Sequence, residues 1–263
     1  MDLKLLSKRA LITGATRGLG FATARLLSQE GALVAINGRD DTRLQTAVLK
    51  ISNETRRPVY GIQGDVSQPT TVEKIVHDAA ETLGGLDFLV CNAGGPPPGA
   101  FDSFDEEIWM KAINLSFMSN VRLIKAALPY LRRSEAACVL TVTSYSVKQP
   151  IPNLVLSNSI RAATVGLTKS LALELGKDGI RFNSILPAWT ETERVTELMT
   201  ARAHANGTTL AEELVKQSRE SALGRLARPE EFASAAVFLL SPLASYLTGV
   251  MLPVDGGMYK GTF

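Results

Sequence analysis

The composition and charge of the chain exclude several classes of protein. Its 263 residues are 45% hydrophobic and 21% charged, which is typical of a globular protein and not of a disordered one. The formal net charge of +2, from 28 basic and 26 acidic side chains, is too small to indicate a nucleic-acid or membrane partner. With only two cysteines, Cys91 and Cys138, and two histidines, a disulfide scaffold is excluded and a metal site is not expected.

The amino-terminal segment has none of the features of a signal peptide. Charged residues interrupt its apolar residues, and no cleavage site follows. The sequence also contains no run of about 20 apolar residues that could span a membrane. We therefore expect a cytoplasmic protein.

Short apolar runs alternate with amphipathic helical runs along the chain. In chain order, the predicted elements are strand 10–13, helix 21–27, strand 32–36, a helix reaching residue 51, strand 59–62, helix 70–83, strand 88–91, helix 106–131, strand 138–142, helix 156–175, strand 180–186 and, after one further helix, strand 250–254. Mostly apolar strands that alternate with helices predict a parallel sheet that is buried on both faces. The fold class is therefore α/β, a doubly wound parallel sheet with helices on both faces, in a single domain over residues 1–263.

The segment 190–223 interrupts this alternation. It carries helical runs around residues 194–203 and 210–221, joined at Asn206-Gly207. It also follows the sixth strand at the carboxyl edge of the sheet, where ligands bind in such folds. We interpret it as a mobile substrate lid, and a plain surface insertion is the alternative.

A glycine-rich turn, Gly14-Ala-Thr-Arg-Gly-Leu-Gly20, follows the first strand and opens a helix. Glycines permit the tight turn and let the backbone approach a pyrophosphate at the positive helix N-terminus. The spacing is G-x-x-x-G-x-G and not the commoner G-x-G-x-x-G, so a purely structural turn is the alternative. Its position between a strand and a helix favours dinucleotide binding.

The end of the second strand indicates which nicotinamide cofactor is used. NAD enzymes usually place an acidic residue there, whereas this chain has Arg39 at about the expected distance from the glycine turn. A guanidinium suits the 2′-phosphate of NADP, and Arg17 could supply a second charge. Two solvated surface arginines are the alternative, because Asp40 and Asp41 are close to Arg39 in the sequence.

Taken together, these features resemble the short-chain dehydrogenase/reductase family over nearly the whole chain. The matching positions are Thr13 to Gly20, Gly64-Asp65-Val66, Cys91-Asn92-Ala93-Gly94, Asn114, Ser144, Arg181-Phe182-Asn183, Pro187 and Asp255-Gly256-Gly257. The resemblance implies a seven-stranded Rossmann-like sheet and a nicotinamide cofactor, with Asp65 at the adenine and the Pro187 segment at the nicotinamide. The candidate cofactor-binding residues are Gly14, Thr16, Arg17, Gly18, Leu19, Gly20, Arg39, Asp65, Val66, Asn92, Ala93, Gly94, Arg161 and Pro187.

The chemistry that the resemblance implies is hydride transfer between the nicotinamide and a carbonyl/alcohol pair. In the family a serine polarises the carbonyl, a tyrosine thirteen residues later is the acid or base, a lysine four residues further tunes it, and an asparagine organises a relay water. Ser144 and Asn114 match, but Ser157 stands in the tyrosine position and Arg161 in the lysine position. A serine alcohol is far less acidic than a phenol, while an arginine stays protonated and can still hold a ribose hydroxyl.

Other residues could replace the missing acid. Tyr145 is followed by Lys148, which could lower its pKa; the alternative is that Tyr145 packs over the mouth of the site and Lys148 is solvated. His204 in the presumed lid is a further candidate, although a lone histidine in a polar helix is more often a surface residue. The candidate catalytic residues are Ser144, Asn114, Tyr145, Ser157 and Arg161.

The leading prediction is an NADP(H)-dependent oxidoreductase that acts on a small-molecule carbonyl or alcohol, with 3-oxoacyl reductase as one option and NAD as the less suitable cofactor. A catalytically silent NADP(H)-binding protein, a sensor or an inactive subunit, is the alternative, since the family's tyrosine and lysine are replaced. The resemblance further implies a homo-oligomer, a tetramer or dimer, in which the helices 106–131 and 156–175 pair across a two-fold axis.

Overall fold

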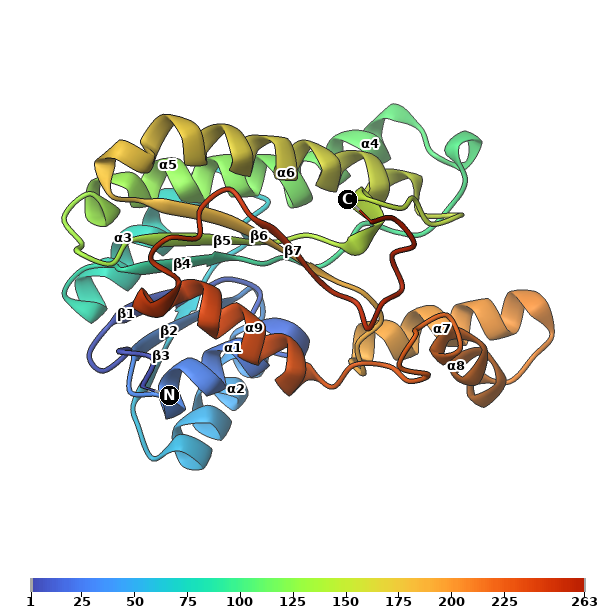
Figure 1. Ribbon diagram of the computed structural model, residues 1–263, viewed down its shortest axis with the longest axis horizontal. Helices are drawn as coiled ribbons and strands as arrows, with labels where there is room; N and C mark the ends of the chain where they lie inside the picture. Colours follow the sequence, from blue (N-terminus) through green and yellow to red (C-terminus); the bar gives the residue numbers. More distant parts are fainter. Residues whose placement is uncertain (1, 263) are drawn as a thin grey trace.

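Seven parallel strands form one continuous sheet in the computed structural model, which describes residues 2–262. The strands are β1 (Arg9–Ile12), β2 (Leu33–Gly38), β3 (Val59–Gln63), β4 (Phe88–Cys91), β5 (Cys138–Val142), β6 (Arg181–Pro187) and β7 (Met251–Val254), in the spatial order β3-β2-β1-β4-β5-β6-β7. The chain builds outward from β1 to β3 and then returns to the other side of β1, so the switch point lies between β1 and β4 (Figure 1). The predicted doubly wound α/β fold is confirmed.

Helices cover both faces of the sheet (Figure 1). One face carries α1 (Gly18–Gln29), α2 (Asp41–Thr55) and α9 (Pro229–Leu240), and the other carries α3 (Pro69–Leu83), α5 (Ser119–Leu131) and α6 (Val155–Leu175). Successive residues of β1 point to opposite faces: Ala10 and Ile12 pack with the first group, and Leu11 packs with the second. Both faces are therefore apolar, and each fully buried leucine or isoleucine contributes about 1.5–3 kcal/mol.

The predicted helix 106–131 is interrupted by a change in helical geometry. It begins as α4 (Glu106–Ile113), capped by the Asp105 carboxylate, which accepts a hydrogen bond from the backbone N–H of Ile108. The backbone then forms a π-turn over Asn114–Met118 before α5 begins. A π-turn inserts an extra residue into a helix and rotates the side chains that follow, and such turns are frequent at functional sites.

The segment that interrupts the alternation forms two helices beyond the carboxyl edge of the sheet (Figure 1). They are α7 (Glu193–Asn206) and α8 (Leu210–Ser218), joined at Gly207, whose φ of 64° lies in the left-handed region that glycine favours. The predicted helical runs are thus confirmed, although α8 ends at Ser218 and not at 221. Met199 of α7 packs with Tyr145 and Trp189 in an apolar cluster that attaches the two helices to the sheet.

The described residues 2–262 contain no helix that is long and apolar enough to cross a membrane. They also contain no group of three or more His, Cys, Asp or Glu side chains that could hold a metal ion.

Cys91 and Cys138 are buried free thiols, and burial raises the pKa of both. A thiol that stays protonated is unreactive, so burial makes both cysteines inert core residues.

Candidate active site

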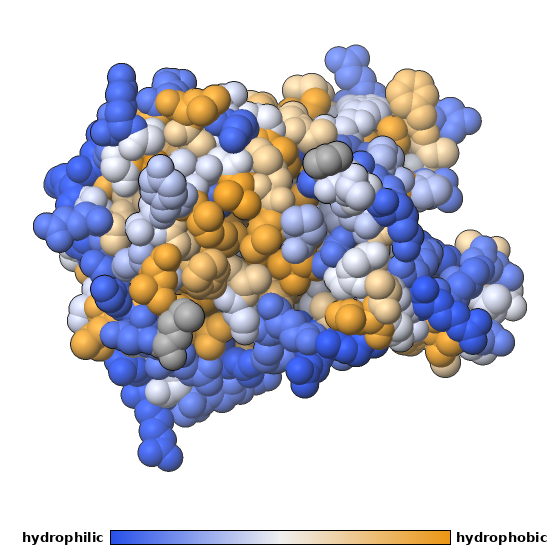
Figure 2. Space-filling model, viewed as in Figure 1, coloured by the Kyte–Doolittle hydropathy of each residue, from blue (hydrophilic) through white to orange (hydrophobic). Residues whose placement is uncertain are grey.

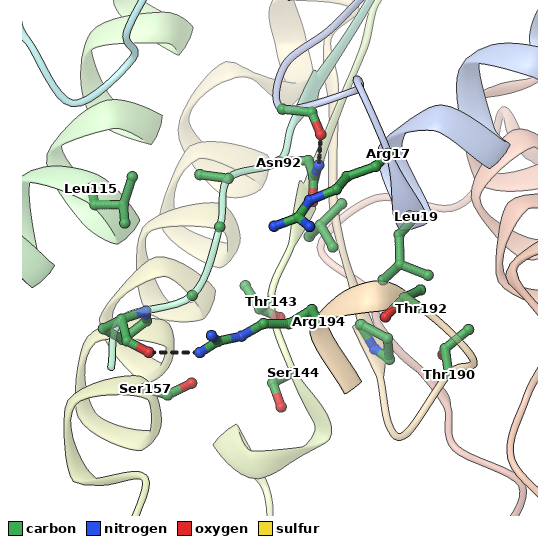
Figure 3. A pocket seen from close by; sticks show the side chains of 18 of the residues that line it. Arg17, Leu19, Asn92, Leu115, Thr143, Ser144, Ser157, Thr190, Thr192 and Arg194 are labelled. Atoms are coloured by element: carbon green, nitrogen blue, oxygen red, sulfur yellow. Dashed lines mark hydrogen bonds between the residues drawn. The ribbon is translucent and has the colours of Figure 1, made fainter. Parts of the chain in front are cut away.

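A cavity of ≈ 420 Å³ opens at the carboxyl edge of the sheet, where the strand order reverses (Figure 3). Ligands bind at this place in doubly wound sheets. Four of the five candidate catalytic residues line it, namely Ser144, Tyr145, Ser157 and Arg161. The candidate cofactor-binding residues that line it are Gly14, Thr16, Arg17, Gly18, Leu19, Arg39, Asp65, Val66, Asn92, Ala93, Gly94, Arg161 and Pro187. The structure thus brings the two predicted sets of residues into one cavity, with Gly20 and Asn114 as the exceptions among the predicted residues.

The glycine turn is packed against the end of β4. A Cβ at Gly14 would lie 2.7 Å from the carbonyl oxygen of Asn92, and one at Gly20 would lie 2.8 Å from the carbonyl oxygen of Gly14. The Asn92 side chain donates hydrogen bonds to the carbonyl oxygens of Thr13 and Gly14, at 3.1 and 2.9 Å. Gly20 therefore has a packing role beneath the turn, and Asn92 fixes the turn at the switch point.

The N-terminus of α1 faces the cavity without a side-chain cap. Its preceding residue, Arg17, has an extended backbone and makes no capping hydrogen bond, and Gly18 and Leu19 of the first turn line the cavity. The first N–H groups of a helix carry a partial positive charge and suit a phosphate. Together with the glycine positions that admit no Cβ, these open N–H groups fit the pyrophosphate of a dinucleotide.

Arg39 lies just after β2 with its guanidinium in solvent. Its side chain is 74% exposed, and a guanidinium nitrogen lies 3.8 Å from the Asp65 carboxylate. The neighbouring Asp40 is engaged elsewhere, because its carboxylate caps α2 by accepting a hydrogen bond from the backbone N–H of Arg43. Asp41 accepts a hydrogen bond from the Gln45 amide. Neither aspartate next to Arg39 in the sequence is paired with it, so the guanidinium is available to a ligand.

The Arg17 guanidinium does not lie free, as a second contact to the 2′-phosphate of NADP would require. Its guanidinium pairs with the carboxylates of Glu193 and Glu197 on α7, the latter at 3.1 Å. The hydrogen bond to Glu193 raises the pKa of Arg17. In this structure Arg17 therefore joins the glycine turn to the predicted lid and does not point a free charge at the 2′-phosphate position.

Two serine hydroxyls lie at the other end of the cavity (Figure 3). The Ser144 hydroxyl oxygen accepts a hydrogen bond from the backbone N–H of Ser146 at 3.1 Å, so its own O–H remains free to donate. Ser157, in the first turns of α6, makes no side-chain hydrogen bond with any residue of the described chain. Both hydroxyls can therefore donate to an oxygen atom that enters the cavity.

Arg161 follows Ser157 by one helical turn and is anchored on one side only. Its Nη1 donates to the carbonyl oxygens of Val142 and Thr143 at 3.0 and 2.9 Å, which fixes the guanidinium at the end of β5. Burial and the nearby Arg194 guanidinium lower the pKa of Arg161 to about 10. Since Arg161 forms no ion pair within residues 2–262, its charge is compensated only by these carbonyl dipoles.

Tyr145 lines the cavity, but its surroundings do not match those expected for an acid activated by Lys148. The ammonium of Lys148 lies over the ring of Tyr259, 4.9 Å from its centroid. Tyr145 is buried beside Trp189 and Met199, and this burial raises the pKa of its phenol. The surroundings of Tyr145 therefore favour the alternative, in which it packs over the mouth of the site, over a phenol whose pKa Lys148 lowers. His204 is exposed near the end of α7 and does not line the cavity.

Asn114 begins the π-turn, but its side chain is engaged away from the cavity. Its amide oxygen accepts a hydrogen bond from the Arg122 guanidinium at 3.0 Å. Leu115, the next residue, lines the cavity instead. Asn114 itself does not line the cavity, and its role in a water relay stays a prediction.

Arg194 also lines the cavity, although no motif in the sequence identifies it as a site residue. Its side chain extends from the first turn of α7 across the cavity and donates to the carbonyl oxygen of Pro96 at 3.0 Å (Figure 3). Its guanidinium lies next to Ser157 in this view (Figure 3). The only feature of the sequence that points to Arg194 is that its segment follows β6, at the edge of the sheet where ligands bind.

Comparison with known proteins gives matches over nearly the whole chain. A family model described as enoyl-(acyl carrier protein) reductase matches residues 14–259, a range that contains every residue lining the cavity. Human dehydrogenase/reductase SDR family member 2, a mitochondrial protein, is 35% identical over 254 residues, 96% of this chain and 86% of the relative. The L-rhamnose 1-dehydrogenase (NAD(P)(+)) of Sphingomonas sp. (strain SKA58) is 34% identical over 98% of both chains.

A solved structure has nearly the same fold. The L-sorbose reductase of Gluconobacter frateurii, complexed with NADPH and L-sorbose, superposes with a TM-score of 0.94 at 31% identity. The match covers 99% of this chain and 100% of that one.

Proposed function

The chain belongs to the short-chain dehydrogenase/reductase (SDR) family, and we propose that it is an NADP(H)-dependent reductase of a small-molecule carbonyl compound. It is an NAD(P)-dependent oxidoreductase, as are the relatives it matches. One observation supports the preference for a carbonyl reductase that uses NADP(H): a single cavity joins the open N-terminus of α1 and the solvent-exposed Arg39 guanidinium to the hydroxyls of Ser144 and Ser157. A dinucleotide site and a carbonyl-polarising site are thereby continuous.

The preference for NADP(H) rests on Arg39. Its guanidinium lies at the carboxyl end of β2, where a ribose hydroxyl or its phosphate is bound in this fold class, and the neighbouring aspartates are engaged in α2. A charge-assisted hydrogen bond contributes about 1.5–3 kcal/mol, so NADPH should bind at least roughly tenfold more tightly than NADH.

Calorimetric titration of both cofactors tests this preference. Arg39→Ala should weaken NADPH binding by about 10- to 100-fold and leave NADH binding nearly unchanged. Arg43→Ala, a matched loss of charge in the first turn of α2 outside the cavity lining, should change neither affinity. Equal affinities in the parent protein, or tighter NADH, would contradict the assignment and would mean that Asp40 or Asp41 reaches the ribose instead.

The roles of the residues in carbonyl reduction follow from their positions. When bound, NADPH supplies the hydride, and the carbonyl oxygen gains negative charge. The free O–H of Ser144 can donate to that oxygen, and the unpartnered hydroxyl of Ser157 can donate beside it. The Arg161 guanidinium adds a positive potential at the same end of the cavity. Together these groups bind and polarise a carbonyl without being acids themselves.

We propose that the protein is an atypical member of its family, with Ser157 and Arg161 in place of the tyrosine and lysine that the resemblance implies. The proton that completes the reduction then comes from water at Ser157, because the only tyrosine in the lining, Tyr145, is buried with a raised pKa. NADPH oxidation across a panel of carbonyl compounds tests this activity. Tight NADPH binding without oxidation of NADPH by any compound would favour the alternative of a silent binding protein.

We also propose that the protein assembles into a homo-oligomer. Apolar side chains gather in the middle of the face that carries β7 (Figure 2). β7 pairs only with β6 among the described strands, and Leu173 of α6 is 78% exposed. In contrast, Ile124 and Ala127 of α5, which belongs to the first of the two helices expected to pair, are buried in the protomer's own core. A contact through α6 and β7 therefore has more support than one through the apolar residues of α5.

A further inference from the structure

The serine end of the cavity carries two guanidinium groups that have no carboxylate partner in the cavity lining. Four arginines line the cavity, Arg17, Arg39, Arg161 and Arg194, against two carboxylates, Asp65 and Glu193. Glu193 pairs with Arg17, and Asp65 lies 3.8 Å from Arg39, so both carboxylates are used at the nucleotide end. Arg161 and Arg194 are left without a carboxylate in the lining.

These two guanidinium groups converge on one point. A Cβ placed on Gly95 would lie 3.6 Å from Nη2 of Arg161 and 3.7 Å from Nη2 of Arg194. Gly95 has no side chain, so both terminal guanidinium nitrogens face the cavity close to its Cα. The distances are those of ordinary contact, and a ligand group packed against the Gly95 backbone could reach both nitrogens.

Both arginines are held in place by bonds that leave these nitrogens able to donate further. Arg161 is anchored through Nη1 to the carbonyl oxygens of Val142 and Thr143. Arg194 Nη2 donates to the carbonyl oxygen of Pro96, and its nearest carboxylate, Glu197, lies 3.9 Å from Nη1 and is half exposed. Two like charges held close together in a partly buried site are unfavourable until an anion lies between them.

We infer that Arg161 and Arg194 bind an anionic group of the substrate, a carboxylate, beside Gly95. The serines indicate where the rest of such a substrate lies, because Ser144 and Ser157 line the same cavity as the two arginines (Figure 3). The substrate class is then an oxo acid, with its carbonyl at the serines and its carboxylate at the arginines. This inference rests on the proposed function only for the carbonyl; the anion site stands on the two guanidinium groups.

A diphosphate is the other anion that could occupy this point, and the cofactor would bring it. The open N-terminus of α1 already offers a separate phosphate site beside Arg17. We therefore assign the point at Gly95 to the substrate's carboxylate, and the experiment includes an arm for each source.

The test compares five-carbon oxo acids, with the carbonyl at successive positions, with their methyl esters. Binding to the complex of the protein with NADP⁺, which cannot donate a hydride, is measured by calorimetry, and NADPH oxidation is measured separately. At least one acid should bind at least about tenfold more tightly than its ester. Arg194→Gln should remove that difference while changing the dissociation constant of NADPH by less than about threefold.

The controls use the same helix and the same point in space. Arg202→Gln removes a charge from α7 outside the cavity lining, where Arg202 donates to Gln217, and should preserve the preference for acids. Gly95→Ala keeps both charges but places a methyl group between them, and should reduce the preference. This variant keeps the inference testable if Arg194→Gln fails to fold.

The inference would be overturned if acids and esters bound equally tightly to the parent protein. It would also be overturned if Arg194→Gln still bound acids more tightly than esters. Alternatively, Arg194→Gln could weaken NADPH binding tenfold or more without any acid preference in the parent, which would assign the point to the cofactor's diphosphate. Rapid reduction of esters and acids alike would refute the anion site and uphold the proposed function. Tight binding of acids without NADPH oxidation would uphold the anion site and refute the proposed function.

Discussion

Restoring a phenol and an ammonium on α6 is the sharpest test of how this site transfers a proton. The double variant Ser157→Tyr with Arg161→Lys places an ionisable acid beside Ser144, one helical turn before a lysine. The cation next to the introduced phenol would lower its pKa, which the alcohol of Ser157 cannot match. We expect the double variant to turn over carbonyl compounds faster than the parent.

The expected gain in rate comes from Ser157→Tyr, and the expected loss of stability comes from Arg161→Lys. A positioned general acid accelerates proton transfer by roughly 10²–10⁴, equivalent to about 3–5.5 kcal/mol of barrier. Arg161→Lys also loses at least one of the two hydrogen bonds to the Val142 and Thr143 carbonyl oxygens, about 1.5–3 kcal/mol for a charged donor. That loss lowers Tm by roughly 3–12 °C for a chain of this size, so the gain in rate must be measured well below the new Tm.

The assay is NADPH oxidation at saturating cofactor across the carbonyl panel, for both single variants and the double variant. Ser159→Tyr is the matched control, because Ser159 is exposed on α6 and does not line the cavity. Tyr145→Phe in the parent should cost less than about tenfold, since the buried phenol is a poor donor. A double variant that folds, binds NADPH and gains nothing would refute the lost-acid reasoning, and a collapse of activity in Tyr145→Phe would identify Tyr145 as the donor.

Two further predictions concern the scaffold. Asp87 is buried and accepts hydrogen bonds from Arg9 and Ser134, and these bonds lower its pKa. Asp87→Asn should therefore lower the free energy of unfolding by about 2–4 kcal/mol and Tm by roughly 5–15 °C. The control Asp178→Asn, at a surface residue, should cost less than about 1 kcal/mol. Because the folded pKa lies below the unfolded value, this stabilisation is complete above about pH 4 and disappears as the pH falls through the folded pKa, so thermal melts of parent and variant should converge in acid. Sedimentation should show a dimer or tetramer at micromolar concentration that Leu173→Glu dissociates, and a purely monomeric parent would contradict the proposed assembly.

The fold could be predicted from the sequence because the signal is repeated in every strand. Phe88–Cys91 is apolar at every position and Cys138–Val142 at every position but Thr141, as expected of parallel strands that are covered on both faces. The π-turn at Asn114–Met118 could not be predicted in this way. An inserted residue changes the hydrogen-bonding register of a helix without changing its composition, so the sequence still reads as one continuous helix.

The site could be predicted where function depends on local conformation and not where it depends on distant contacts. Gly14 and Gly20 are needed because the neighbouring backbone leaves no room for a Cβ, which the motif already indicates. Arg17 was assigned to the cofactor by its place in that motif, but its partner Glu193 is 176 residues later in the chain. Arg194 was missed for the same reason, since the inward-facing residue of a segment after β6 depends on how α7 docks.

In the proposed site, Ser157 and Arg161 of α6 and Arg194 of α7 would change the same property, the way in which the carbonyl is bound and protonated. A phenol and an ammonium supply a proton to the reduced carbonyl, whereas two hydroxyls and two guanidinium groups supply hydrogen bonds and positive charge. With a substrate that carries its own carboxylate, the charge at this end of the cavity is neutralised by the substrate and the proton is taken from water. The rate should then depend strongly on the charge of the substrate and little on pH near neutrality, because no group with a pKa near neutrality lines the serine end. An enzyme with an activated phenol would show the opposite pattern, with a pH-dependent rate and no preference between an oxo acid and its ester.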